Sequence, residues 1–373
     1  MKRTLSLILA MVLMVSMLAG CGSKTETPST PDDTSKAEET TYNFSVANIY
    51  AAINNHGILG QAWCDEITAR TDGRVTFDFY PGASLVADGA SYDAIKTGIA
   101  DIAMFSTAST PGVFPAMSLL EVPQGYGSGW VGTKVANEFL AEFDLAEFNG
   151  IHPLYVHTTS PLVILGNKEV KTAADFKGMI IRSGSDLATK TATALKGQAY
   201  SCQITELYEA LSKNMCDAAI SGIDTLAGFN LAEVVKYVYP DPSYGKIGVI
   251  LTAMNENKWN SLPADIQAVF EEVSAEFADN QGMCWRYEDA VSLDTFQKDH
   301  NGSVVYFDEA TQAELKAMLD PVTAEFAANT GIAQSDIEAY QAFLTERIEK
   351  YNAEQPSFEE AIAWGDSFLA VLK

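Results

Sequence analysis

The sequence is poor in positive charge, and this excludes one large class of partners. Its 373 residues include 24 Lys and Arg against 49 Asp and Glu, a net charge of −25. Removal of an N-terminal segment containing Lys2 and Arg3 would give −25 − 2 = −27. Nucleic acids bind basic surfaces, so we expect no such partner. An anionic ligand would need a local cation, because the overall field opposes it.

Motifs for metal binding and catalysis are also missing. The four histidines show no HExxH spacing and the five cysteines form no CxxC pair, so the sequence predicts no metal site. It contains no GxSxG elbow and no GxxxxGK[ST] loop, and no carboxylate pair stands out as acid and base. We therefore expect a binding protein without a cofactor rather than an enzyme.

The only long apolar run lies at the N-terminus. Leu5 to Leu18 follow two basic residues and are too few for a membrane span, which needs about 20 residues. Residues 1–20 are predicted to be a signal peptide. Leu18-Ala19-Gly20-Cys21 is similar to a bacterial lipobox, with Cys21 as the lipidation site; a plain signal peptide is the alternative. Residues 21–41 are rich in Ser, Thr, Pro and Glu, which predicts a disordered tether.

Beyond the tether, short apolar strands alternate with amphipathic helices. RVTFDFY (74–80) alternates apolar and polar residues as a strand does, and 58–71 has helical spacing that ends before Gly73. Further strands are predicted at 102–105, 162–165, 179–181 and 218–220. This alternation is typical of the α/β class with parallel strands. The last third, from Asn257, is mostly helical in pattern, and we assign Trp285 and Trp364 to the core.

A repeated pattern indicates two related lobes. Tyr92 precedes Asp101 by nine positions and Tyr208 precedes Asp217 by nine, and each Asp opens a short apolar strand. Two such lobes would enclose a cleft, where small molecules commonly bind. The predicted domains are 42–162 with about 248–293 for lobe I, and 163–247 with about 294–373 for lobe II and the C-terminal helices.

Arg182 is the main candidate for ligand binding. It ends the run Met179-Ile180-Ile181 and precedes Ser183-Gly184-Ser185 and a predicted helix. A strand end followed by a helix N-terminus is where open α/β sheets bind ligands, and a guanidinium can hold a carboxylate through two hydrogen bonds. From the pattern alone, an arginine that reaches solvent or pairs with a carboxylate explains the position equally well.

Five segments occur in an order found in one protein family. The chain resembles, over about Tyr42 to Tyr351, the DctP-type solute-binding proteins of tripartite ATP-independent periplasmic (TRAP) transporters. The resemblance implies a two-lobed fold similar to type II periplasmic binding proteins, with a hinge, and it implies that Arg182 clamps a ligand carboxylate. The segments are TARTDGRVTFDFYPGASL (68–85), AIKTGIADIA (94–103), VFPAMSLLEVP (113–123), FKGMIIR (176–182) and MNENKWNSLPADIQ (254–267).

The resemblance implies further ligand contacts at Asn48, Ser106 and Ser221, and Ile204 takes a position that is often aromatic. Ser221 stands where many members carry Asn, and a second arginine of some members would fall near Leu162. These departures predict an apolar pocket and a monocarboxylate with an apolar body. Tyr126, in a glycine-rich segment that we expect to be a flexible loop, is a candidate for the rim of the cleft. For all of these polar residues a purely structural role is the alternative.

The sequence therefore predicts an extracytoplasmic receptor, anchored to the bacterial cell membrane by lipid at Cys21. It would bind a small organic acid between its lobes and deliver it to the membrane permease of a TRAP transporter. The alternatives are a binding protein of an ABC importer and the ligand-binding subunit of a sensory system.

Overall fold

The computed structural model describes residues 40–373. The predicted signal peptide, Cys21 and nearly all of the predicted tether lie outside these residues. None of the helices in the described part combines the length and hydropathy that a membrane crossing requires.

The first sheet has five strands in the order β2-β1-β3-β10-β4. Strand β1 lies parallel to β2 and β3, while β10 runs antiparallel to β3 and β4. The alternation of more buried and more exposed side chains in β2 matches the pattern seen in the sequence. The bounds are β1 Tyr42–Asn48, β2 Val75–Tyr80, β3 Ile102–Ser106, β4 Ile151–Thr158 and β10 Val249–Asn255.

The second sheet has six strands in the order β11-β9-β5-β8-β6-β7. Strand β6 lies parallel to β7 and β8, and β5 runs antiparallel to β8 and β9. The bounds are β5 Val163–Gly166, β6 Ile180–Ser183, β7 Gln198–Ser201, β8 Ala218–Ser221, β9 Tyr237–Tyr239 and β11 Ser303–Val304.

The α/β class is confirmed, but the expectation of parallel strands is wrong for β5 and β10. These are the strands at which the chain enters one sheet from the other: residues 159–162 join β4 to β5, and residues 240–248 join β9 to β10. A helical crossover places the next strand parallel within the same sheet, whereas these two links lead to the other sheet. Neither linking segment contains a helix, and both sheets are mixed.

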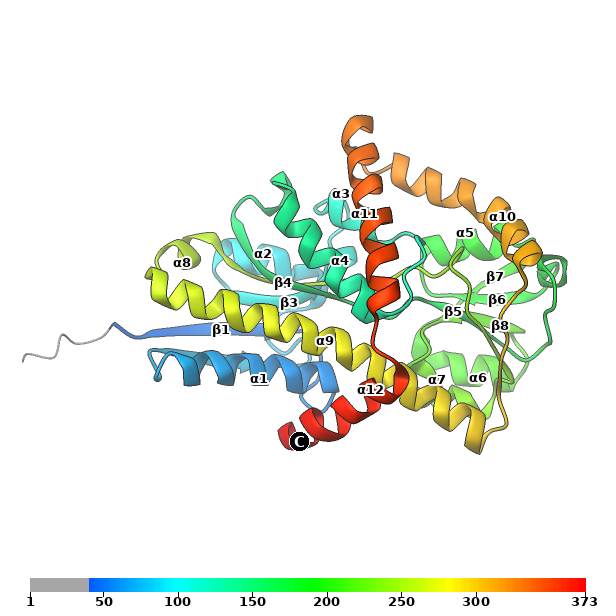
Figure 1. The fold of residues 1–373 in the computed structure, drawn as a ribbon, viewed down its shortest axis with the longest axis horizontal. Helices are drawn as coiled ribbons and strands as arrows, with labels where there is room; N and C mark the ends of the chain where they lie inside the picture. The colour runs from blue at the N-terminus through cyan, green and yellow to red at the C-terminus, as the bar shows by residue number, and fades with distance from the viewer. Residues whose placement is uncertain (1–39) are drawn as a thin grey trace, which may run out of the picture. The chain divides into compact units, whose positions relative to one another are not determined.

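One long helix packs against elements of both sheets. Helix α9 (Ala264–Asp299) packs against α1, α4 and β4 on the side of the first sheet and against α7 on the side of the second, as Figure 1 shows in yellow. Its residue Phe270 is buried in a core formed with β1 and α1, whereas Phe296 is buried among β5, β8 and β9. Burial of such a side chain contributes roughly 1.5–3 kcal/mol. Both sheets are therefore packed against the same helix.

The other helices cover the sheets. The contact between α4 and α9 is close because Gly282 has no side chain: a Cβ there would lie 3.1 Å from the Cα of Trp130. The bounds are α1 Asn55–Arg70, α2 Ser91–Thr97, α3 Pro115–Glu121, α4 Gly129–Glu142, α5 Asp186–Ala194, α6 Leu207–Ser212, α7 Thr225–Gly228, α8 Glu256–Asn260, α10 Glu309–Ala328, α11 Gln334–Glu354, α12 Phe358–Trp364 and α13 Ala370–Leu372.

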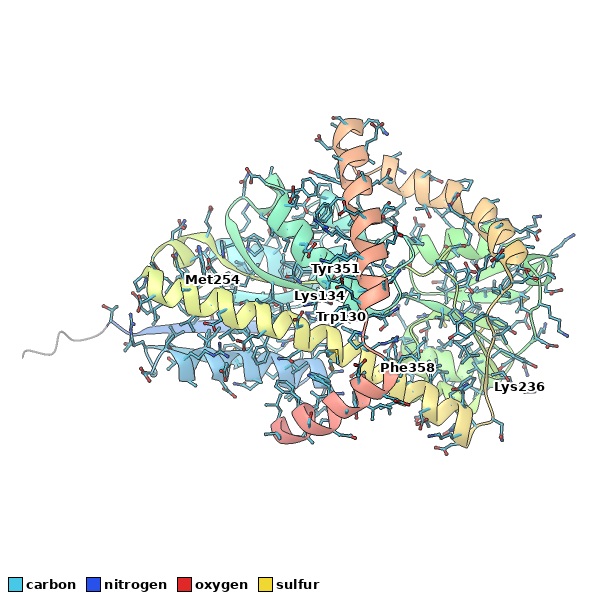
Figure 2. All side chains as sticks on the ribbon, viewed as in Figure 1. Trp130, Lys134, Lys236, Met254, Tyr351 and Phe358 are labelled. Carbon is cyan, nitrogen blue, oxygen red and sulfur yellow. The ribbon has the colours of Figure 1, made fainter. Side chains whose placement is uncertain are left out.

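The C-terminal helices differ from the predicted grouping with lobe II. Leu344, Ile348 and Tyr351 of α11 form an apolar stripe that is buried in the core of the first sheet, against α4. Tyr351 lies edge-on to Trp130 at 5.8 Å, and Figure 2 shows these two residues beside Lys134. Helix α12 packs on α9. The helical pattern predicted for the last third of the chain is confirmed, and the predicted lobe boundaries stay predictions.

Candidate ligand-binding site

Arg182 stands near the end of β6, directly before the start of α5. Ser185 caps this helix, since its Oγ accepts a hydrogen bond from the backbone N–H of Ala188 at 3.2 Å. The arginine is 6% exposed. A strand end and a helix N-terminus therefore meet at this side chain, as the sequence predicted.

The guanidinium group is held only by backbone carbonyls. Nε and Nη2 donate to the carbonyl oxygen of Cys202 at 3.1 and 2.9 Å, and Nη1 makes a long 3.5 Å contact to that of Ile220. Within residues 40–373 no carboxylate forms an ion pair with Arg182. Carbonyls orient the group without neutralising it, and a buried charge without a counter-ion costs several kcal/mol. Two of its five N–H groups remain for a ligand.

Gly184 allows the guanidinium to lie against the backbone. A Cβ at this position would lie 2.9 Å from both Nη1 and Nη2, closer than van der Waals contact permits. Any side chain at residue 184 would therefore displace the guanidinium. The Ser183-Gly184-Ser185 sequence combines this open position with the cap of α5.

A cavity of about 430 Å³, here called the Arg182 cavity, opens in front of this group. Its volume is in the range of sites for small organic ligands. Of the residues expected to bind ligand, Arg182, Ile204 and Ser221 line this cavity together. Leu162, at the position where a second arginine was considered, also lines it, and the wall is apolar there.

Two further residues of the Arg182 cavity were not expected from the sequence. Lys246 brings a second cation, and its Nζ lies 3.7 Å from Oε2 of Glu121. Trp285, which we assigned to the core, is 8% exposed and lines the cavity, and its buried Nε1 has no hydrogen-bond partner within the described residues. Neither position had a local signal, because each reaches the cavity only through tertiary contacts.

Burial raises the pKa of two carboxyl groups near these cations. Burial raises the pKa of Asp224, which lines the Arg182 cavity, to about 6, and the charge of Glu288 acts in the same direction. Burial also raises the pKa of Glu121 above its ordinary value, although Lys246 and the hydroxyl of Thr107 favour its ionised form. The negative charge that Asp224 brings to the Arg182 cavity therefore changes near pH 6.

A second cavity of about 430 Å³ adjoins the first. It shares Ser185 and Lys246 with the Arg182 cavity. Its other walls come from segments that flank the first sheet, including Thr107 and Pro115, and from Phe326 on α10. The two cavities together bring residues that follow strands of both sheets to one place, as expected for a cleft between two lobes.

Asn48 and Ser106 do not line either cavity. Asn48 is fully buried: its Oδ1 accepts from the backbone N–H of Tyr50 at 2.8 Å and its Nδ2 lies 3.1 Å from the sulfur of Met104. Ser106 is half-buried, and its backbone N–H donates to Asp88 at 3.0 Å. The expected role of both residues as ligand contacts stays a prediction.

Tyr126 lies in a different cavity, of about 330 Å³, together with Arg286 and Asp289. Burial raises the pKa of its phenol well above the ordinary value. The glycine-rich segment around it is bonded to α11, and its expected flexibility stays a prediction. The amide of Asn352 on α11 bonds both the carbonyl of Gly125 and the N–H of Gly127, at 2.8 Å each.

The cysteines of the described residues carry free thiols. Cys202 and Cys216, the closest pair in sequence, are among them, together with Cys64 and Cys284. Cys64, Cys216 and Cys284 are buried and Cys202 is half-buried. A contribution of Cys202 to the site comes through its backbone carbonyl, which orients Arg182.

Comparison with known proteins assigns this geometry to a family. Residues 48–330 match the model of the DctP family, described as bacterial extracellular solute-binding protein, family 7. A solute-binding protein of Albidiferax ferrireducens is 26% identical over 224 residues, which are 57% of this chain and 63% of that protein. The match thus spans less than two thirds of that relative's length.

Solved structures agree over more of the chain. A TRAP periplasmic solute-binding protein from Desulfovibrio salexigens, in an open complex, has a TM-score of 0.78 and 25% identity over 86% of this chain and all of its own. A marine metagenome TRAP solute-binding protein in complex with 3-hydroxybenzoate has a TM-score of 0.70 and 20% identity over 84% of this chain and 99% of its own. The chain belongs to family 7 of the bacterial extracellular solute-binding proteins, the DctP family of TRAP solute receptors, which are not enzymes.

Proposed function

We propose that this protein is a lipid-anchored extracytoplasmic receptor that binds a small monocarboxylate with an apolar body and delivers it to a TRAP permease. The carboxylate binds Arg182, and the apolar body lies against Leu162, Ile204 and Trp285. Lipid at Cys21 holds the receptor at the membrane, with residues 22–41 as its tether.

The observation that carries the proposal is the uncompensated charge of Arg182. A 6% exposed guanidinium that contacts carbonyls but no carboxylate within the described residues is stabilised by an anion from outside the chain. Charge-assisted hydrogen bonds to such an anion contribute on the order of 1.5–3 kcal/mol each. Lys246 already lies opposite Glu121, and Asp224 on the cavity wall is ionised above about pH 6, so the cavity has little net positive charge, which favours one carboxylate over two.

The apolar lining supports the choice of ligand class. Leu162, Ala188, Ile204 and Trp285 are among the non-polar residues that line the Arg182 cavity. A relative with the same fold binds 3-hydroxybenzoate, a monocarboxylate with an aromatic body. The unpartnered Nε1 of Trp285 would donate a hydrogen bond to a polar substituent on that body. Benzoate and its hydroxy derivatives are therefore the first compounds to test.

Closure of the cleft would link binding to transport. The cavity beside Lys246 has walls on both sides of the cleft, so a ligand held at Arg182 gains contacts to the first-sheet side only when the two sides approach. Binding would thereby favour a closed state. We propose that the permease recognises this state.

The proposal is tested with Arg182→Ala and a panel of organic acids. Wild-type protein should bind a benzoate-type monocarboxylate more tightly than a dicarboxylate or a sugar acid, as measured by calorimetry after a thermal-shift screen. Arg182→Ala leaves a desolvated carboxylate unpaired, which costs roughly 2–5 kcal/mol. The affinity should fall by about tenfold to a few thousandfold.

The control for this experiment is the melting temperature of the ligand-free variant, which should stay close to that of wild type. Unchanged affinity in Arg182→Ala would show that the carboxylate binds elsewhere. Tighter binding of a dicarboxylate would contradict the ligand class while leaving Arg182 in place.

The anchor is tested separately in cells. Cys21→Ser should release the receptor from the membrane fraction, because lipid transfer needs the thiol of Cys21. Fractionation followed by immunoblotting measures this. A variant that stays in the membrane fraction and retains no lipid would contradict lipid anchoring without affecting the ligand-binding proposal.

A further inference from the structure

A cluster of three potential metal ligands lies between the start of α1 and the middle of α9. His56 is the second residue of α1, and Cys284 and Glu288 are four positions apart on α9. One ligand atom from each lies within 4.8 Å of the others. His56 is 1% exposed, Cys284 is fully buried and the side chain of Glu288 is 21% exposed. The cluster therefore reaches solvent only on the side of Glu288.

The imidazole of His56 is oriented as in metal sites. Its Nδ1 lies 2.5 Å from Oε1 of Gln281, and the amide Nε2 of Gln281 faces the carbonyl of His56 at 3.4 Å. With the amide in this orientation Oε1 is the acceptor and Nδ1 the donor, so Nε2 faces Cys284 and Glu288. Burial lowers the pKa of His56, but Cys284 and Glu288 outweigh it and raise this pKa well above its ordinary value, so a bound ion would displace a proton from Nε2. Metal-binding histidines are held by such a bond from their other ring nitrogen. The ring is also stacked on Trp285 at 4.3 Å.

The distance between the histidine and glutamate ligand atoms fits a shared ion. Nε2 of His56 lies 3.4 Å from Oε2 of Glu288, which exceeds the roughly 2.7–3.2 Å of an N–H···O bond. Two atoms bound to one tetrahedral Zn²⁺ at about 2.1 Å are about 3.4 Å apart. Within residues 40–373 the buried Nε2 has no hydrogen-bond partner. The other oxygen of Glu288 accepts from Nδ2 of Asn55 at 3.0 Å, which leaves Oε2 directed at the cluster.

We propose that His56, Cys284 and Glu288 bind a divalent cation of the zinc type. A thiolate and a carboxylate carry two negative charges, which a divalent ion neutralises inside a buried site. A thiolate with an imidazole selects zinc over magnesium or calcium, which take oxygen ligands. The three protein ligands leave a fourth position toward the exposed side of Glu288. The ion would connect α1 to α9, the helix that packs on both sheets.

The sequence did not predict this site, because its residues are far apart along the chain. His56 is separated from Cys284 and Glu288 by more than two hundred residues, and Cys284 with Glu288 matches no metal-binding motif on its own. Only the packing of α1 on α9 brings them together. The three residues differ from those that line the Arg182 cavity, although Trp285, which stacks on His56, belongs to that cavity.

The test uses the full chain with Cys21→Ser, so that the N-terminal thiol contributes nothing. After treatment with a chelator, Co²⁺ serves as the spectroscopic probe and Zn²⁺ as its competitor. We expect one Co²⁺ per chain, a thiolate-to-cobalt charge-transfer band in the near ultraviolet, loss of that band on addition of Zn²⁺, and a higher melting temperature with Zn²⁺ than with chelator.

Matched variants locate the ion. Cys284→Ser should lose the charge-transfer band, whereas Cys64→Ser, which removes another buried thiol in the same core, should keep it. Asn55→Ala removes the partner of Glu288 and should weaken Zn²⁺ binding by about 10- to 100-fold. Far-ultraviolet circular dichroism verifies that each variant is folded. If a variant is unfolded, His56→Gln is used in its place.

Three results would overturn the proposal. They are the absence of stoichiometric Co²⁺ binding to wild type, binding without a charge-transfer band, and a band that survives in Cys284→Ser. In the first case His56 and Glu288 form a simple buried ion pair. Calorimetry with the monocarboxylate on the same samples shows separately whether the Arg182 site is intact.

Discussion

Each sheet contains the same arrangement of hydrogen bonds around one aspartate, here called the frame. The two sheets differ at the residues that face the cleft. In the first sheet, Asp101 donates its backbone N–H to the carbonyl of Ser45 at 3.2 Å and accepts the N–H of Ser45 on its carboxylate at 2.9 Å. In the second sheet, Asp217 does the same with Ile180, at 2.7 and 3.0 Å.

The frame also includes a lysine in each case. Lys258 lies 3.1 Å from the carboxylate of Asp101, and Lys168 lies 2.7 Å from that of Asp217. Each Asp follows a helix and precedes a central strand, β3 or β8. That strand runs parallel to the strand that holds the hydrogen-bond partner of the Asp, β1 or β6. The structure thus confirms that the spacing of nine residues marks equivalent units.

The shared frame aligns the two sheets residue by residue. The strand register places Ala47 of the first sheet where the second has Arg182, and Phe105 where the second has Ser221. Ala47 and Phe105 are buried in the core, while Arg182 and Ser221 line the cavity. One copy of the unit thus supplies core packing and the other supplies residues of the cavity wall. Asn48 is equivalent to Ser183 rather than to Arg182, which explains why it stays internal.

The largest expected effect tests whether the frames are equivalent. Asp101→Ala and Asp217→Ala each remove the acceptor of a partly buried backbone N–H, which costs about 1–3 kcal/mol. We expect both variants to lower the free energy of unfolding by similar amounts, measured by denaturant titration. A large loss in one and none in the other would break the comparison.

A smaller effect sharpens the difference at the cleft. Gly184→Ala places a Cβ 2.9 Å from two guanidinium nitrogens and displaces Arg182. Loss of about one charge-assisted hydrogen bond predicts monocarboxylate affinity reduced on the order of tenfold. The control is Gly228→Ala on α7, where a Cβ would meet nothing within 4 Å. Equal affinity of the two variants in calorimetry would show that the position of Arg182 is not critical.

The smallest expected effect concerns pH. Asp224, with a pKa raised to about 6, is neutral below that pH and ionised above it, where its charge opposes a bound anion. Affinity for a monocarboxylate that is ionised throughout should therefore fall as pH rises from 5 to 8, on the order of threefold to tenfold. Asp224→Asn should flatten the profile. A wild-type affinity that rises with pH would contradict this sign.

Much of the site could be predicted where the signal is local. Arg182 was found because a charge at the end of an apolar strand, before a turn and a helix, has few explanations, and the family resemblance selected among them. Lys246 and Trp285 could not be found in the same way. Lys246 lies in a linking segment without a pattern, and Trp285 looks like any aromatic residue on a helix that packs in a core.

By itself the sequence determined the alternation of strands and helices, the repeated unit and the arginine at its end, because these depend on side-chain periodicity and on residues near one another along the chain. Only the tertiary structure decided the antiparallel strands, the packing of α11 on the first sheet, the second cation and the indole of the cavity, and the His56–Cys284–Glu288 cluster. Each of these depends on segments that are distant in sequence, and their contacts are set by the packing of both sheets on α9.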